Sequence, residues 1–414
     1  MSLKQLDKLA TEVEAEVQPI YREIEARALI NHAKVLEGFH LARVADYHLR
    51  GTNGYGYNDP GREALEKIYA HVFGAEAALV RGQIVSGTHA IAIALFGLLR
   101  PGDELLAVQG SPYDTLEELI GKRGNVPGSL RDLGVSYQQV ELTPAGLLDW
   151  TAIAQALSSK TKVVLVQRSR GYAWRPALTL PELKRLVEFV KERAPQAYVF
   201  VDNCYGELVD TAEPPSVGAD LIAGSLIKNP GGGLAPTGGY VVGRKELVEM
   251  AANRWTAPGI GAEVGPSLGH QRLLLQGIFM APHIVAEALK GAVFAARLFE
   301  RLGFKVSPTY DEPRSDIIQS IALETPERLV AFCRGLQAAS PVDAHVLPEP
   351  NYMPGYEDDV IMAAGTFVQG ASLELSADAP LREPYAVYLQ GGLSKEYVRL
   401  GVLSAARNVL KLQG

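Results

Sequence analysis

Short apolar runs alternate with helical stretches along the middle of the chain, and this alternation constrains the fold more than any other feature. The apolar runs lie at residues 77–80, 104–108, 162–166, 198–201, 220–223 and 239–242. Stretches with helical spacing separate them, at residues 86–99, 116–121 and 181–194. Strands that are apolar on both faces and alternate with helices indicate a largely parallel sheet covered by helices. The sequence therefore predicts an α/β fold that binds its ligand where strands end and loops begin.

The two ends of the chain follow other patterns. Apolar residues recur every three to four positions from residue 3 to about 35, which predicts an amphipathic helix interrupted or kinked near Pro19. A second long helix is expected at 284–302, then alternating elements near 317–323 and 371–375, and a closing helix near 397–410. For a chain of 414 residues, we predict a helical arm over 1–50, a large domain over 51–284 and a small α+β domain over 285–414.

Composition argues against several classes of partner. The chain has 40 basic and 47 acidic residues and no block of like charge, so a nucleic-acid partner is not expected. Cys204 and Cys333 are too few for a disulfide framework or a cysteine zinc site, and the histidines form no ligand-spaced cluster with acids, so no metal is expected. The N-terminus lacks a signal-peptide pattern, and the apolar run at 90–99 is shorter than the roughly 20 residues that span a bilayer. We expect a cytoplasmic protein without a membrane partner.

Two polar residues follow apolar runs that are neighbours along the chain. Asp202 ends the run at 198–201, and Lys228 comes shortly after the run at 220–223. Each has an ordinary explanation, because aspartate commonly caps a helix and lysine commonly leaves a strand for solvent. These two residues indicate a binding site only in combination with a phosphate-binding loop elsewhere in the chain.

A candidate phosphate cradle lies at residues 82–89. Ser86 is placed to cap the following helix, so Ser86, Gly87 and Thr88 would present free backbone N–H groups at a helix start. The helix dipole contributes only about 0.3 to 2 kcal/mol, so a doubly charged phosphate needs further donors. The Ser225 hydroxyl is a candidate for one of them. An ordinary capped helix is the alternative explanation of this loop.

Several short motifs occur in one order along the chain: GYNDPGREALE (56–66), VSGTHAI (85–91), GSPYDTL (110–116), VDNCYGE (201–207), SLIKNPGGG (225–233) and LELSADAPLR (373–382). From about residue 10 to the C-terminus, the ordered set resembles the methionine γ-lyase-like family, also called aluminium resistance proteins. That family belongs to the cystathionine-metabolism branch of fold type I enzymes, which depend on pyridoxal 5′-phosphate (PLP).

The resemblance implies roles for the cofactor site. Lys228 would hold PLP as a Schiff base, and the Asp202 carboxylate would face the pyridine nitrogen and favour its protonated form. Tyr113 would stack on the ring and could donate a proton to a leaving thiolate, although a tyrosine half-buried at a turn is the alternative. The members of the phosphate pocket would be Ser86, Gly87, Thr88 and Ser225.

The chain also departs from the wider lyases. These carry a Tyr-x-Arg pair that a neighbouring subunit contributes to the phosphate, whereas this chain has Tyr55-Gly56-Tyr57. We expect Tyr57 to make the cross-subunit contact and Tyr55 to help bind substrate, and Arg62 need not replace the missing arginine.

An arginine is also expected for the substrate. The α-carboxylate calls for a planar guanidinium, and the resemblance implies Arg382, which follows a strand expected at 371–375 and best matches the family's small-domain arginine; a solvated surface arginine is the alternative. Arg168 and Arg170 follow the run at 162–166, at another expected cofactor-facing strand end. The sequence does not say what these two arginines recognise.

The resemblance implies a PLP-dependent carbon–sulfur lyase that acts on a sulfur-containing amino acid and releases a thiol, a keto acid and ammonia. Two alternatives remain open at this point: another PLP enzyme of aminotransferase, racemase or aldolase type, and a low-turnover regulatory or stress protein with this fold. A homo-oligomer is expected, as a homotetramer built as a dimer of dimers with sites shared between subunits. The sequence does not distinguish β from γ elimination.

Overall fold

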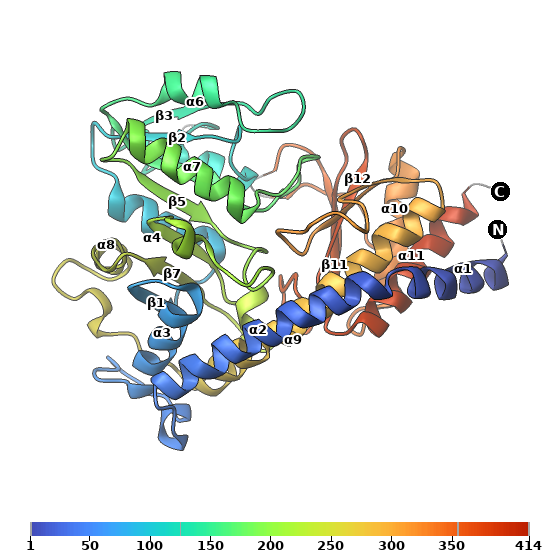
Figure 1. Ribbon diagram of the computed structural model, residues 1–414, viewed down its shortest axis with the longest axis horizontal. Helices are drawn as coiled ribbons and strands as arrows, with labels where there is room; N and C mark the ends of the chain where they lie inside the picture. The colour runs from blue at the N-terminus through green and yellow to red at the C-terminus, as the bar shows by residue number, and fades with distance from the viewer. Residues whose placement is uncertain (1, 125, 354–355, 413–414) are drawn as a thin grey trace.

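The computed structural model describes residues 2–124, 126–353 and 356–412, and the chain folds around two separate β-sheets (Figure 1). The larger sheet has the strand order β1-β7-β6-β5-β4-β2-β3, and only β7 runs antiparallel to its neighbours. The predicted α/β architecture with a mostly parallel sheet is therefore confirmed. The strands are β1 (Ala77–Arg81), β2 (Glu104–Ala107), β3 (Ser136–Gln139), β4 (Thr161–Gln167), β5 (Tyr198–Asp202), β6 (Leu221–Ser225) and β7 (Gly239–Gly243).

Helices cover both faces of the larger sheet. Successive strand residues enter different cores: Val164 and Val199 pack in the cluster that contains α3 and α7, whereas Leu165 and Phe200 pack in the cluster that contains α4 and α8. Side chains that alternate between two buried faces must all be apolar, which explains the uninterrupted apolar runs. The helices of this part are α3 (Pro60–Phe73), α4 (Gly87–Leu98), α5 (Asp114–Ile120), α6 (Trp150–Ala156), α7 (Leu180–Arg193) and α8 (Lys245–Trp255), with short 3₁₀ turns η1 (Asp46–Leu49), η2 (Pro214–Val217), η3 (Asn229–Gly231) and η4 (Gly261–Glu263).

The smaller sheet is antiparallel, with the strand order β10-β11-β12-β9-β8. Its strands are β8 (Lys305–Ser307), β9 (Gln319–Ala322), β10 (Val360–Ala363), β11 (Ser376–Pro380) and β12 (Ala386–Gln390). Helix α10 (Pro326–Gln337) packs against this sheet, and α11 (Lys395–Lys411) packs against α10 and α9. The strand expected at residues 371–375 is wrong in position. Those residues form a turn in which Leu375 has a φ of 69°, and their apolar side chains reflect burial in a loop.

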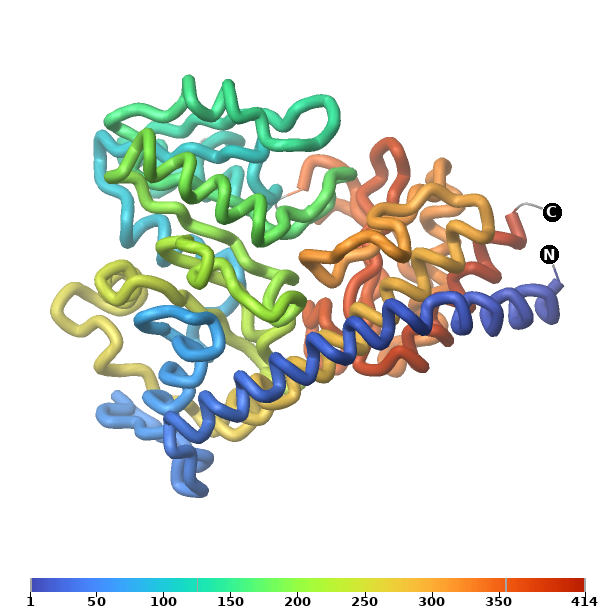
Figure 2. The backbone as a smooth tube through the Cα atoms, viewed as in Figure 1, coloured from blue at the N-terminus to red at the C-terminus, as the bar shows by residue number. Residues whose placement is uncertain are grey.

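Helices α2 (Gln18–Leu41) and α9 (Gln271–Arg301) lie side by side and extend along both halves of the molecule, and α1 (Leu3–Glu16) continues the line of α2 beside the smaller sheet's helices (Figure 2). Pro19 lies in the first turn of α2, where its missing N–H costs no helical hydrogen bond, so the helix break falls where the sequence indicated. By length and composition α9 could cross a membrane, but 83% of its apolar window is buried inside the protein, as in a core helix. The predicted domain boundary at residue 284 falls within α9.

The turn after β6 rests directly on α9. A Cβ atom added to Gly277 of α9 would lie 2.5 Å from the Gly231 carbonyl oxygen, and one added to Gly232 would collide with the Gly277 carbonyl oxygen. Gly232 also has a φ of 54°, which favours glycine. Glycine at these positions therefore allows the backbone after Lys228 to touch the helix backbone.

Candidate functional site

A cavity of about 290 Å³ lies at the carboxyl ends of β5 and β6, with further walls from the segment between residues 356 and 378. This inner cavity brings together seven residues that the sequence analysis singled out: Ser86, Gly87, Thr88, Tyr113, Asp202, Ser225 and Lys228. They come from four separate stretches of the chain, and the parallel strands place their ends at one edge of the sheet. The predicted grouping around Lys228 is therefore present as a physical cavity.

Lys228 follows β6 and points its amine at an aromatic ring. Its Nζ lies 3.9 Å from the centroid of the Tyr205 ring, a cation–π distance. Burial alone would lower the pKa of Lys228, but the neighbouring Cys204, Tyr205 and Asp202 raise this pKa above its ordinary value. In the chain by itself the amine is therefore a protonated ammonium.

Asp202 is the last residue of β5 and is only 8% exposed. The backbone N–H of Cys204 donates to its Oδ1 at 3.1 Å. Burial raises the pKa of Asp202, while the Lys228 charge and the Cys204 N–H act in the opposite direction. A carboxylate held in this way can form a charge-assisted hydrogen bond to a ring N–H inside the cavity.

The start of α4 forms the third wall and has the features of an anion site. Ser86 caps the helix as expected, because its Oγ accepts from the His89 N–H at 3.0 Å, and the first N–H groups of a helix lack intrahelical partners. A Cβ atom on Gly87 would lie 3.2 Å from Cys204 Sγ and 3.4 Å from Ser225 Cβ, so the absence of a side chain there leaves space. Together with the Thr88 and Ser225 hydroxyls, this wall fits a phosphate group.

Tyr113 stands at the edge of the inner cavity, directly before α5. Its hydroxyl is hydrogen-bonded to the Tyr356 hydroxyl, and its ring meets the Tyr172 ring edge-on at 5.6 Å between centroids. Burial raises the pKa of Tyr113 well above its ordinary value. The phenol is therefore protonated at neutral pH and can serve as a proton donor.

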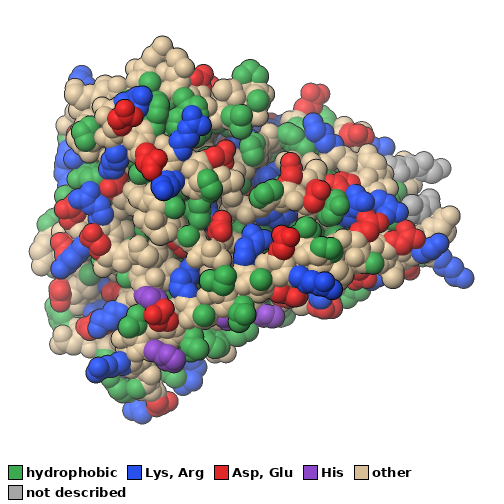
Figure 3. All heavy atoms as spheres, in the orientation of Figure 1, with side chains coloured by type: hydrophobic (Ala, Val, Ile, Leu, Met, Phe, Trp, Pro, Cys, Tyr) green, Lys and Arg blue, Asp and Glu red, His purple; other side chains and the backbone are tan. Residues whose placement is uncertain are grey.

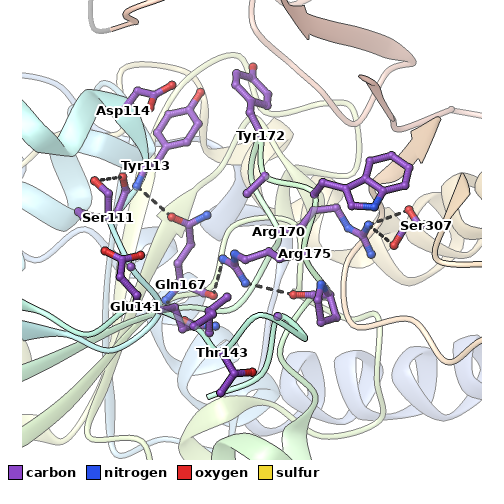
Figure 4. Close-up of a pocket in the computed structure, with 18 of the residues that line it drawn as sticks. Ser111, Tyr113, Asp114, Glu141, Thr143, Gln167, Arg170, Tyr172, Arg175 and Ser307 are labelled. Carbon is purple, nitrogen blue, oxygen red and sulfur yellow. Dashed lines mark hydrogen bonds between the residues drawn. The ribbon is translucent and has the colours of Figure 1, made fainter. Parts of the chain in front are cut away.

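A second, outer cavity of about 760 Å³ adjoins the first, and Figure 4 shows the side chains around it. Tyr113 and Tyr172 line both cavities, so these tyrosines stand between them. The outer cavity carries charged groups of both signs: Asp114, Glu117, Glu141, Arg170, Arg175, Glu357 and Arg382.

Arg382 lines the outer cavity and not the inner one. It lies between β11 and β12, where its guanidinium pairs with Asp358 at 3.2 Å and donates to the Tyr172 carbonyl at 3.0 Å. The predicted contact between Arg382 and a substrate carboxylate therefore requires a substrate that reaches past the tyrosines, or a movement of the side chain.

Arg168 and Arg170 also lie outside the inner cavity, and the structure supplies the account that the sequence lacked. Arg168 is fully buried and donates to Asn203 Oδ1 at 3.0 Å and to the Gly206 carbonyl at 2.9 Å, near Glu213. Arg170 donates to the Ser307 carbonyl at 2.7 Å and thereby ties the end of β4 to β8 of the smaller sheet. Both arginines hold the fold together around the site.

Tyr55 and Tyr57 lie away from the inner cavity within one chain, with exposed fractions of 74% and 61%. Arg62 is buried and donates to the Gly56 carbonyl at 2.6 Å and to the Gly265 carbonyl at 2.9 Å. It therefore fixes the loop that presents the two tyrosines. Their contact with a neighbouring subunit stays a prediction.

Sequence reasoning missed the residues that close the inner cavity from the small-domain side. Asp378 on β11 is buried and accepts from the Tyr172 hydroxyl at 2.6 Å and from Gln390 Nε2 at 2.5 Å. Burial raises the pKa of Asp378, and the Lys228 charge opposes that shift. The signal was present, since an acid between apolar neighbours in LELSADAPLR is unusual for a buried strand, but the strand was expected five residues too early.

A family model, known sequences and solved structures were compared with this chain, and all three comparisons find similar proteins over nearly its full length. The family model described as "Methionine gamma-lyase" matches residues 6–410. An uncharacterized Bacillus subtilis protein, YnbB, is 54% identical over 409 residues, which cover 99% of this chain and 97% of that protein. The solved structure of a Listeria monocytogenes protein, described as a candidate cystathionine beta-lyase involved in aluminum resistance, has 52% identity and a TM-score of 0.95, covering 97% of this chain and all of that one. A carbon-sulfur lyase involved in aluminum resistance from Clostridium novyi has 48% identity and a TM-score of 0.93, covering 97% and 95% of the two chains.

Proposed function

The chain belongs to the methionine gamma-lyase family, and on this premise we propose that it is a PLP-dependent carbon–sulfur lyase that acts on a sulfur-containing amino acid. The observation that carries the proposal is one cavity that contains a half-buried lysine, a buried aspartate and the capped start of α4. No group of three or more metal-binding side chains is found among the described residues.

The residues of the inner cavity match the parts of PLP one by one. Lys228 Nζ would hold the aldehyde carbon, and the Asp202 carboxylate would face the ring nitrogen. The start of α4, with Thr88 and Ser225, would bind the phosphate. When bound, PLP supplies an electron sink that stabilises negative charge on the α-carbon of an amino acid.

Two side chains of this protein would carry out the proton transfers. Lys228 Nζ, as a free amine, would accept the proton from the substrate α-carbon. The Tyr113 hydroxyl would donate a proton to the departing sulfur. Tyr113, Tyr172 and Tyr356 stand together at the mouth of the inner cavity, where they would limit the entry of water.

The first experiment asks which lysine carries the cofactor. Borohydride reduction of the PLP-loaded protein, followed by peptide mass spectrometry, should place the added mass on Lys228. The Lys228→Ala variant should lose the visible absorbance of the bound cofactor, whereas Lys184→Ala, on the exposed face of α7, should keep it. Added mass on another lysine, or unchanged absorbance in Lys228→Ala, would contradict the proposal.

The second experiment identifies the reaction. The protein is incubated with cysteine, methionine and thioether amino acids and assayed for thiol, keto acid, ammonia and racemised product. Release of thiol without an added keto acid supports the lyase. Dependence on a keto acid would indicate an aminotransferase, loss of optical activity alone a racemase, and no turnover at all a regulatory protein.

We also propose that the protein is a homo-oligomer in which Tyr57 reaches the cavity of a neighbouring subunit. Tyr55, Tyr57 and several apolar side chains of α2, among them Leu29 and Ile30, are exposed on the single chain. Acidic, basic and hydrophobic side chains are interspersed along α1 and α2 on the face shown in Figure 3.

Mixing inactive Tyr57→Ala subunits with inactive Lys228→Ala subunits should restore part of the activity if sites are shared. A fully active monomer in light scattering would contradict the assignment.

A further inference from the structure

The proposed proton acceptor, Lys228, lies against the face of one aromatic ring. Its Nζ is 3.9 Å from the centroid of the Tyr205 ring, and both side chains line the inner cavity. Among the described residues that line this cavity, Lys228 is the only one with a basic side chain. The ring therefore contacts the one amine that the proposed reaction uses.

Tyr205 is held in an uncommon backbone conformation. Its φ is 73°, in the left-handed region that a bulky residue adopts only where the surrounding structure holds it there. The Tyr205 carbonyl oxygen accepts from Asn229 Nδ2 at 3.1 Å and from the Ile317 N–H at 3.2 Å. Asn229 Nδ2 also donates to the Glu207 carbonyl at 2.9 Å. The residue next to Lys228 along the chain thus fixes the tyrosine relative to the lysine.

Arg168 holds the same turn through the residue that follows Tyr205. It donates to the Gly206 carbonyl at 2.9 Å, and a Cβ atom added to Gly206 would lie 2.8 Å from Arg168 Cδ. Because Arg168 is fully buried and closely packed against this turn, the turn has little freedom to move. The contact between the Tyr205 ring and the Lys228 amine is therefore built into the fold.

This contact would act on the proton transfer itself. A ring face attracts a cation, but it attracts a neutral amine much less. As Lys228 Nζ accepts a proton from the substrate α-carbon, positive charge develops on this nitrogen, and the attraction to the Tyr205 ring increases with it. An interaction that is stronger in the transition state than in the bound substrate raises the rate of the reaction. The lysine side chain is also flexible, so the ring limits where the free amine can lie.

We propose that Tyr205 assists the proton transfer to Lys228, because its ring positions the free amine and stabilises the ammonium group that forms when the amine accepts the α-proton. The inference rests on the proposed function, since it assumes that Lys228 is the proton acceptor. It adds Tyr205 to the reaction as a positioning residue, and Asn229 supports it by holding its backbone.

The first test weakens the ring face with little change in the space around Lys228. Phenylalanine, and phenylalanines with one, two or three ring fluorines, are placed at position 205 of the cofactor-free protein. Each fluorine withdraws electron density from the ring face and weakens its attraction for a cation. Acetic anhydride labels only the neutral amine. Labelling of Lys228 at pH 8, measured against exposed Lys184 by peptide mass spectrometry, should therefore rise stepwise by about 3- to 10-fold across the series.

The second test measures the proton transfer. The PLP-loaded protein is incubated in D2O with L-norleucine, an amino acid without sulfur, and exchange of the α-proton is followed by NMR. Tyr205→Leu should slow this exchange by about 5- to 30-fold, the value of a desolvated cation–π contact, and should change norleucine affinity by less than about threefold. Tyr205→Phe keeps the ring face and should exchange nearly as fast as wild type. Tyr69→Leu removes a buried tyrosine outside the inner cavity and is the control.

The outcomes separate this inference from the proposed function. Stepwise labelling together with slow exchange in Tyr205→Leu supports the inference. Labelling that does not depend on the number of fluorines, or equal exchange rates in Tyr205→Leu and Tyr69→Leu, would overturn this inference alone. Absence of α-proton exchange in the wild-type protein would overturn the proposed function as well. If Tyr205→Leu does not fold, exchange is measured across the fluorinated series, where it should become slower as labelling rises.

Discussion

The inner cavity is closed by two aspartates that come from different parts of the molecule, and they are held in different ways. Asp202 ends a strand of the larger sheet, where the backbone N–H of a residue two positions later fixes it. Asp378 lies on a strand of the smaller sheet, where side chains 206 and 12 positions away fix it. A hydrogen bond from a main-chain N–H is retained when the side chain of the donor residue is substituted, whereas a hydrogen bond from a side chain is lost. The Asp202 wall of the cavity is therefore preset by the backbone, and the Asp378 wall can be changed by single substitutions.

The largest expected effect tests the Asp202 wall. Asp202→Asn keeps an acceptor for the Cys204 N–H but removes the charge, so the variant should fold. We expect thiol release to fall by about 100- to 1000-fold in kcat, the range seen when one preorganised electrostatic group is removed from an active site. Steady-state kinetics with saturating PLP would show this. A loss of less than about threefold would mean that Asp202 does not act on the cofactor.

Gly87→Ala should have the next largest effect. The new methyl group would lie 3.2 Å from Cys204 Sγ, on the wall assigned to the phosphate, so PLP affinity should fall by about 30-fold while the helix remains stable. Equilibrium titration of the cofactor-free protein measures the affinity. Gly82→Ala in the same loop is the matched control, because its added Cβ would come no closer than 3.6 Å to another side chain and should leave PLP affinity unchanged.

Tyr172→Phe tests the Asp378 wall of the cavity without changing Asp378 itself. The variant removes the 2.6 Å hydrogen bond to Oδ2 and leaves the carboxyl group held by Gln390 alone. We expect kcat/KM for the cleaved amino acid to fall by about 5- to 10-fold, the usual value of one hydrogen bond. Tyr388→Phe, whose ring packs against Tyr172 at 5.6 Å between centroids, serves as the control. Equal kcat/KM values in the two variants would show that the Tyr172 hydroxyl does not support the cavity wall.

The smallest expected effect concerns the pH dependence of stability and comes from Glu207, a buried acid outside the inner cavity. Burial raises the pKa of Glu207 to about 8, and its carboxyl accepts from the Tyr240 hydroxyl at 2.7 Å. Because the folded protein holds this proton more tightly than the unfolded chain, Glu207 stabilises the fold fully below about pH 4.5 and loses that contribution as the pH rises toward 8. Its share of the decrease in unfolding free energy is at most about 1.4 kcal/mol per pH unit.

Urea denaturation at pH 6 and pH 8 checks this expectation. Glu207→Gln should flatten the decrease between the two pH values, whereas Glu188→Gln, on an exposed helix face, should not. A decrease of the same size in wild type and Glu207→Gln would show that this carboxyl is already ionised at pH 6 in the folded protein.

The larger sheet and the residues around Lys228 could be predicted from the sequence because their signals are local. Each of its central strands is apolar on both faces, and Asp202, Ser86 and Lys228 each follow a strand at close range. The small-domain wall could not be predicted in this way. The buried turn before β11 is as apolar as a strand, so the strand was placed too early, and the partners of Asp378 meet it only through tertiary folding. The roles of Arg168 and Arg170 were missed for the same reason, since their acceptors lie up to 150 positions away.

The contact between Gly231 and Gly277 has a mechanical consequence. Helix α9 starts beneath the turn that follows Lys228 and ends among the elements that carry β8 and β9, so one helix contacts both halves of the molecule. No side chain separates the two backbones, so neither can shift at this contact without displacing the other. We therefore expect a movement of the small half against a bound molecule to displace the backbone that carries Lys228 as well.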